Sequence, residues 1–277
     1  MAIYYRRIIL ILNIFIIALC TCSCGVTPTD HAEDCEVVLE DNTVLFKYSN
    51  MESYAIQSLA NYTSAVYVTP NIQVNGYNIK TIWETAIVGN TSIKTMIIQD
   101  NIESMEFDLY YEFSSLESVF IGAGMKTVQE GIFFKCPKLK QVTVDVRNTT
   151  YYSENNAIIE KETGRIVAAC SGTREIPTSA EIIGANSFDR ISSKTIIIPD
   201  NIKQIETCAF QNCADLIAVY IPKSVYAIHE DAFLHCEGAT IYCEAEKKPE
   251  GWDENWCETV ANEVHWGVTR EEYPYHS

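Results

Sequence analysis

Apolar residues recur every 23 positions along most of this chain. The recurrence links successive units in the first part of the chain and resumes later, as in these sets: Ile93, Leu116 and Leu139; Met96, Val119 and Val142; Ile205 and Ile228; Cys213 and Cys236. A fixed period of this kind is the signature of stacked repeats, because one unit cannot bury its apolar edge alone. We therefore expect the units to stack into a solenoid with a continuous core.

Within each unit the pattern predicts a short strand followed by a tight turn. Val219 and Ile221 alternate with other residues on one face of a strand, and Pro222 ends it. Apolar residues at the spacing of one helical turn follow at Ala232 and Cys236. The predicted fold class is an α/β repeat, a solenoid of units of about 23 residues with a short parallel strand and a short helical or 3-10 turn in each.

One stretch carries a family resemblance. Residues 205–228 read IETCAFQNCADLIAVYIPKSVYAI, which resembles the repeat I-x-x-x-A-F-x-x-C-x-x-L-x-x-V-x-I-P-x-S-V-x-x-I of BspA-like leucine-rich-repeat cell-surface proteins. The resemblance covers roughly 79–243, although the first two full units carry Ala86-Ile87 and Leu109-Tyr110 in place of the Ala-Phe pair. It implies a leucine-rich-repeat solenoid that acts by adhesion to host or matrix proteins or to other cells.

The first 24 residues have the pattern of an export signal. Arg6 and Arg7 precede an apolar run that only Asn13 interrupts, and a small-residue segment ends it. The run falls short of the roughly 20 apolar residues that span a bilayer. Its end resembles a bacterial lipoprotein signal, with Cys24 as the lipidated cysteine and Cys22 as the alternative. We expect residues 1–24 to be a lipoprotein-type signal peptide that is removed up to the lipidated cysteine. That cysteine then forms the N-terminus of the mature chain, which is held at the membrane by a lipid anchor rather than a transmembrane helix.

The remaining segments divide into caps and an insertion. Residues 25–78 are expected to form an N-terminal linker and cap, 79–243 the solenoid, and 244–277 a C-terminal cap with a polar tail. Between Val144 and Ile183 the phase is delayed by about one and a half repeats, which predicts a hairpin insertion at about 146–178. The insertion is interpreted as a plain decoration or as a protrusion that reads a ligand.

Two local features refine the caps. Apolar runs on both sides of 40–43 suggest a hairpin at the N-terminal end. At the other end, Trp252, Trp256 and Trp266 are expected to cover the last repeat.

The repeat phase also locates a candidate interaction surface. One residue in each unit points away from the core in the same phase, and together these form a largely apolar stripe: Ile97, Phe120, Thr143, Ile197 and Tyr220. Solenoids bind extended partners on such surfaces, and exposed apolar patches mark interaction sites. The alternative is that the stripe is covered by the insertion or packs within the chain.

Charge and chemistry narrow the function. The net charge is −17, and loss of Arg6 and Arg7 with the signal changes it to −19, which disfavours nucleic acid as a partner. His229 and His235 are six positions apart and do not share a helix face, as the histidines of a helical zinc site must. No nucleophile elbow or clustered acid pair is visible either. We expect no catalytic residue, no metal and no cofactor.

The 11 cysteines fall into three groups. Three lie at the export site, and Cys136, Cys213 and Cys236 share one repeat position, where a small buried thiol fits. Of the five others, Cys243 and Cys257 could form a bridge in the cap or remain free thiols.

The function predicted from these features is that of a secreted or surface-anchored binding protein, adhesin-like, with an extracellular or host protein as its partner. The alternatives are a carbohydrate-binding or enzymatic surface protein that uses the insertion, and a purely structural protein of the envelope.

Overall fold

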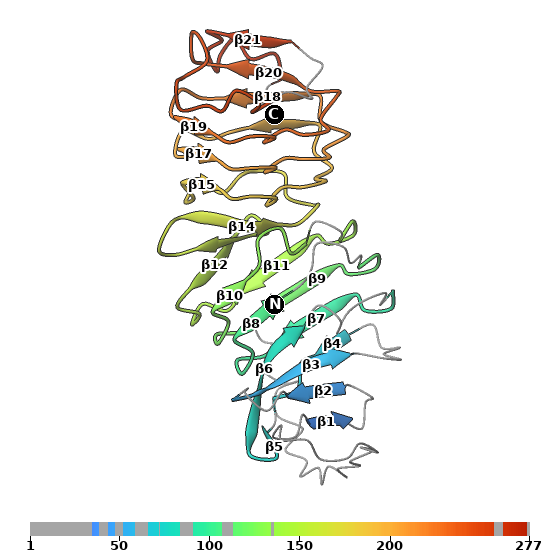
Figure 1. Cartoon of the computed structure of the whole chain (residues 1–277). Coiled ribbons are helices and arrows are strands. Elements are labelled where there is room, and N and C mark those ends of the chain that lie inside the picture. The colour runs from blue at the N-terminus through green and yellow to red at the C-terminus, as the bar shows by residue number, and fades with distance from the viewer. Residues whose placement is uncertain are drawn as a thin grey trace, which may run out of the picture.

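The computed structural model describes residues 35–38, 44–47, 52–58, 66–71, 73–83, 91–106, 113–133, 136–257 and 263–275. The expected signal peptide, with Cys22 and Cys24, lies outside this described part. The described residues form an elongated stack of coils that rises from the N-terminal strands to the C-terminal ones (Figure 1).

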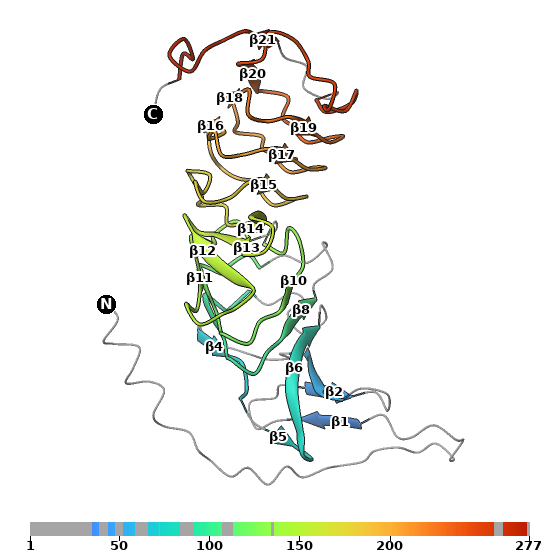
Figure 2. The same cartoon turned by 90° about the vertical axis from the view of Figure 1, so that its left-hand side faces the viewer.

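Two sides of the stack carry the strands. One side, here called the strand face, consists of two parallel sheets: β4 (Val66–Val68), β7 (Thr95–Ile98), β9 (Ser118–Ile121) and β11 (Gln141–Val144); then β16 (Thr195–Ile197), β18 (Ala218–Ile221), β20 (Thr240–Cys243) and β21 (Val264–Trp266). Figure 2 shows β4, β11, β16 and β18 on one side of the coils and the shorter strands β8, β10, β15, β17 and β19 on the other.

Two further sheets include the short strands of the opposite side. The first has the order β1 (Cys35–Val38), β2 (Val44–Lys47), β3 (Tyr54–Ser58), β6 (Tyr77–Trp83), β8 (Ser104–Glu106) and β10 (Thr127–Val128), with β5 (Gln73–Val74) beside β6. The second has the order β12 (Tyr151–Glu154), β13 (Ala157–Glu160), β14 (Arg165–Ala169), β15 (Ile182–Ile183), β17 (Gln204–Ile205) and β19 (Ala227–Ile228).

The strand register confirms the 23-residue spacing. Thr95 pairs with Ser118 and Ser118 with Gln141, so one period separates partners in adjacent coils. The parallel pairing extends beyond residues 79–243, because β3 pairs with β6 before this range and β20 pairs with β21 after it. The N-terminal hairpin is confirmed, since β1 and β2 are antiparallel.

The corners of the coils differ from the expected helical turn. Cys208 and Asn212 have φ values of 57° and 56°, in the left-handed region that a right-handed helix does not contain. At this corner the backbone N–H of Phe210 donates to the carbonyl oxygen of Ala232 in the next coil at 2.8 Å, and the backbone N–H of Asn212 donates to the carbonyl oxygen of Leu234 at 2.8 Å. These N–H groups therefore bond between coils, and the described part of the chain contains no helix. The fold is a β-solenoid, and the α/β description is not confirmed.

The insertion lies inside the stack. Strands β12, β13 and β14 are here called the central meander. Strand β13 is antiparallel to both β12 and β14, and β14 pairs in parallel with β15 of the next coil. Ile158 and Val167 pack into the hydrophobic core of the N-terminal half, whereas Ile159 and Ile166 pack into that of the C-terminal half. The central meander thus separates two cores and is covered on both faces. It is neither a surface decoration nor a protrusion, although its tip at 161–163 is exposed.

An ion-pair network ties the two halves together at this point. Nη1 of Arg165 on β14 contacts Oε1 of Glu130 in the N-terminal half at 2.7 Å and Oε2 of Glu206 in the C-terminal half at 2.6 Å. Burial raises the pKa of the Glu206 carboxyl, and the nearby Arg165 opposes that increase. One guanidinium therefore links carboxylates on the two sides of the central meander.

Candidate binding surface

The N-terminal half of the strand face carries the predicted stripe in register. Ile97 pairs with Phe120, and Phe120 with Thr143, so the three side chains form a ladder across adjacent strands. In each strand these positions are partly exposed, and the residues on either side of them are buried, as in the pattern of β9. The structure therefore brings these three residues together on one open surface.

The C-terminal half carries a second ladder, which extends beyond the expected residues Ile197 and Tyr220. Ile197 pairs with Tyr220, Tyr220 with Tyr242, and Tyr242 with His265. The rings of Tyr242 and His265 stack with their centroids 5.0 Å apart and their planes 15° apart. Both continue the same phase, 22 and then 23 positions after the preceding member, so the repeat period itself could have found them.

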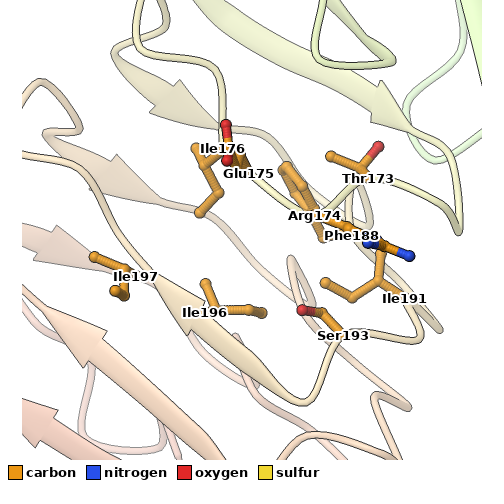
Figure 3. Close-up of a pocket in the computed structure, with 9 residues that line it drawn as sticks. All are labelled: Thr173, Arg174, Glu175, Ile176, Phe188, Ile191, Ser193, Ile196 and Ile197. Carbon is orange, nitrogen blue, oxygen red and sulfur yellow. The ribbon is translucent and has the colours of Figure 1, made fainter. Parts of the chain in front are cut away.

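The two ladders do not form one continuous stripe. Strands β11 and β16 belong to different sheets, because the coil at 173–176 lies between them without forming a strand. A small hollow lies at this break, lined by that coil together with Phe188, Ile191, Ser193, Ile196 and Ile197 (Figure 3). The break separates the candidate surface into an N-terminal and a C-terminal part.

The C-terminal tail covers the second ladder. Tyr273 is fully buried and packs against Ala218 and Tyr220, with Ile197 and Tyr242 beside them. Ala218 and Tyr220 are buried beneath the tail, whereas the corresponding positions of β9 are partly exposed. Figure 2 shows the tail leaving β21 and descending along the side of the stack that carries β16 and β18.

The inclusion of Tyr220 among exposed binding residues is therefore wrong for the chain with its tail in place. Tyr220 is only 1% exposed, and burial raises its pKa to about 12. The covering segment is the tail, which was expected to be polar, and not the insertion.

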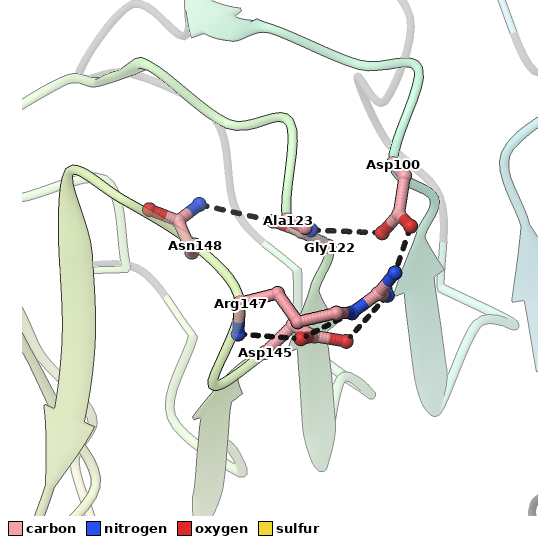
Figure 4. A network of polar contacts seen from close by, with 6 residues as sticks. All are labelled: Asp100, Gly122, Ala123, Asp145, Arg147 and Asn148. Atoms are coloured by element: carbon pink, nitrogen blue, oxygen red, sulfur yellow. Dashed lines mark hydrogen bonds and ion pairs between the residues drawn. The ribbon is translucent and has the colours of Figure 1, made fainter.

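A polar network borders the open ladder where its strands end (Figure 4). Nη2 of Arg147 lies 2.9 Å from Oδ2 of Asp100 and 2.9 Å from Oδ2 of Asp145, and Oδ1 of Asp100 accepts the backbone N–H of Ala123 at 2.8 Å. Hydrogen bonding from Arg147 lowers the pKa of the Asp145 carboxyl. The contacts connect the turns of three consecutive coils. A Cβ at Gly124 would overlap the backbone oxygen of Asp100, which explains a glycine in this turn.

The cysteines and the cap serve packing. Cys213 and Cys236 are buried, and their thiols donate to the carbonyl oxygens of Phe188 and Phe210 in the preceding coil at 3.4 and 3.0 Å. Cys243 and Cys257 are free thiols in the structure.

The C-terminal cap covers the last coil. The ring of Trp256 lies edge-on to that of Phe233, with centroids 6.0 Å apart, and the ring of Trp252 lies 4.8 Å from that of Trp256.

Two further features concern the described residues alone. Within these ranges no group of three or more histidine, cysteine or acidic side chains could hold a metal ion. No helix in the same ranges is long and apolar enough to cross a membrane.

Comparison with known proteins identifies the repeat. A model of the BspA type leucine rich repeat region matches in six copies over residues 42–158 and 170–246, which is well over half of the chain. A comparison with curated proteins gives no match.

Among solved structures, the chain is similar to a leucine-rich repeat protein from Bacteroides ovatus, with 18% identity and a TM-score of 0.46, over 82% of this chain and 52% of that one. It is also similar to a leucine-rich repeat protein from Eubacterium ventriosum, with 12% identity and a TM-score of 0.45, over 87% and 84% of the two chains. A leucine rich cell surface protein from Faecalibacterium prausnitzii is 15% identical over 90% and 98%, with a TM-score of 0.33. On the match of the repeat model, this chain belongs to the BspA-type leucine-rich-repeat family.

Proposed function

We propose that the protein is an adhesin-like binding protein of the cell surface that engages an extracellular or host protein through the N-terminal half of its strand face. The observation that carries this proposal is the partly exposed, in-register ladder of Ile97, Phe120 and Thr143. Regularly spaced side chains on a stiff solenoid suit an extended partner. Phe120 is the aromatic member, and buried aromatic contacts dominate the binding energy of interfaces.

Attachment to the cell envelope completes the proposal. The export signal at 1–24 and the cysteines that end it support secretion with a lipid anchor on Cys24 or Cys22. Intact-mass analysis of the mature protein should show an acylated N-terminus, and an unmodified one would contradict the anchor. The alternative functions that use the insertion receive no support, because the central meander packs on both faces.

Substitution of Phe120 tests the binding surface. We expect the immobilised chain from residue 25 onward to bind a partner when host extracellular proteins are passed over it. Phe120→Ser should weaken that binding by about 2 kcal/mol or more, which is roughly thirtyfold, because an aromatic anchor is lost. Affinity measured by surface plasmon resonance, together with an unchanged melting temperature, gives the comparison.

Tyr226→Ser provides the matched control. Tyr226 is 56% exposed and precedes β19 on the opposite side of the stack, so its loss should leave the affinity unchanged. Equal affinity of the Phe120→Ser variant and the unaltered chain would show that the partner does not bind at the N-terminal half of the strand face.

A further inference from the structure

The tail reaches the strand face through a small, locally closed turn. The backbone N–H groups of Gly267 and Val268 donate to Ala245 and Cys243 of the adjacent coil at 2.9 and 3.0 Å. Thr269 then donates from its backbone N–H and its hydroxyl to Oε2 of Glu272 at 3.0 and 2.8 Å. This turn directs the last described residues back over the sheet, where Tyr273 enters the surface.

Tyr273 occupies a socket that fits an aromatic ring. Its ring centroid lies 5.6 Å from that of Tyr220 and 5.3 Å from that of Tyr242, and the latter pair meets edge to face at 77°. These separations lie within the range of favourable aromatic pairs. The ring is fully buried. Two neighbouring strands thus supply two walls, and the tail supplies the occupant.

The floor of the socket is specific to this coil. Ala218 lies two residues before Tyr220 and is paired with Thr195 and Thr240 in the adjacent strands. The same position in the other half holds larger or polar side chains, namely Thr95, Ser118 and Gln141. Ala218 is the smallest and the only apolar residue in this set, and it is fully buried beneath the tail. The small side chain leaves the depth that the ring of Tyr273 fills.

We propose that Ala218, Tyr220 and Tyr242 form a second docking site, whose partner is an extended peptide segment bearing an aromatic side chain, and that the tail occupies it as a displaceable internal ligand. The tail itself shows which chemistry fits. Tyr273 is buried, whereas Arg270, Glu271 and Glu272 beside it are exposed, so the aromatic ring is the part of the segment that the site holds. An occupant tethered in this way competes at high effective concentration, so the site is closed until a stronger segment replaces it.

The site is independent of the proposed binding surface. It lies in the C-terminal half, beyond the break in the strand face, and shares no residue with the ladder of Ile97, Phe120 and Thr143. The experiment below therefore succeeds or fails separately from the one with Phe120→Ser.

A labelled peptide tests the socket. The probe is the synthetic peptide VTREEYPYHS, which corresponds to residues 268–277, and binding to the mature chain is followed by fluorescence anisotropy. Tyr273→Ala in the chain should open the socket and raise the affinity for this peptide at least tenfold over the unaltered chain. Tyr275→Ala is the matched control, because Tyr275 is 38% exposed at the rim; that variant should bind as weakly as the unaltered chain.

Two further comparisons make the result specific. Ala218→Leu combined with Tyr273→Ala should abolish peptide binding by filling the floor, and a peptide with alanine in place of its first tyrosine should not bind. Equal binding to the unaltered and Tyr273→Ala chains, or binding that survives Ala218→Leu, would overturn the proposal.

A second readout uses the tail directly. In the chain with Ala218→Leu alone, the filled socket should expel Tyr273 and accelerate tryptic cleavage after Arg270 at least tenfold. Cleavage at the rate of the unaltered chain would contradict a socket at this place, whether or not the Tyr273→Ala variant folds well.

Discussion

Replacing either Ile158 or Ile159 by alanine is expected to lower the free energy of unfolding by about 2–5 kcal/mol, the usual cost of truncating a buried isoleucine. The two side chains are neighbours on β13 and therefore point to opposite faces of the strand. Both are 0% exposed, because Ile158 packs into the N-terminal core and Ile159 into the C-terminal core. A strand on the surface would have one inexpensive position out of two.

Urea unfolding of the two variants provides the measurement, with Glu162→Ala as control because Glu162 is exposed at the tip of the central meander. The control should lie within about 0.5 kcal/mol of the unaltered protein. A large loss for one isoleucine and almost none for the other would mean that the central meander is a decoration on one face of the solenoid.

Asn148→Ala is expected to cost about 4 kcal/mol, because it leaves several buried backbone groups without their partner at about 1–3 kcal/mol each before relaxation. Asn148 is 1% exposed. Its Nδ2 donates to the carbonyl oxygens of Gly122 and Met125, each at 3.0 Å, and its Oδ1 accepts the N–H groups of Thr150 and Tyr151 at 2.9 and 2.8 Å. One side chain therefore joins the turn after β9 to the start of the central meander.

Thr149→Ala is the control for this substitution, since Thr149 is adjacent in sequence and exposed. Thermal and chemical unfolding should place Asn148→Ala far below both the control and the unaltered protein. Equal stability of the two variants would show that the amide network does not hold this junction.

The repeat phase predicted the register of the coils but not the shape of their corners. Apolar residues such as Ala209, Phe210 and Cys213 have the spacing of a helical turn. A corner with left-handed residues buries the same positions, and those residues here are Cys208 and Asn212 rather than glycine. Hydrophobic spacing alone could not distinguish the two, because neither residue type signals a positive φ as strongly as glycine does.

The repeat period predicted the open ladder of the N-terminal half. It did not predict that the tail covers the ladder of the C-terminal half. Tyr220 is buried by a residue that lies 53 positions further along the chain, and no local pattern connects them. The tail is mostly polar, and the tyrosines within it were the available signal. The burial of the insertion had a clearer signal in the sequence, because the uninterrupted apolar runs at 157–159 and 166–169 are typical of strands buried on both faces.

The strand face is open in its N-terminal half and closed by the tail in its C-terminal half. Hydroxyl-radical footprinting of the unaltered mature protein, with mass spectrometry of the oxidised peptides, tests this arrangement. Phe120 and Tyr220 occupy equivalent ladder positions, and Tyr226 serves as the exposed reference. The predicted result is ready oxidation of Phe120 and Tyr226 and at least tenfold slower oxidation of Tyr220. Oxidation of Tyr220 at the rate of Tyr226, or protection of Phe120 as strong as that of Tyr220, would show that the two halves of the strand face are not open and closed in this way.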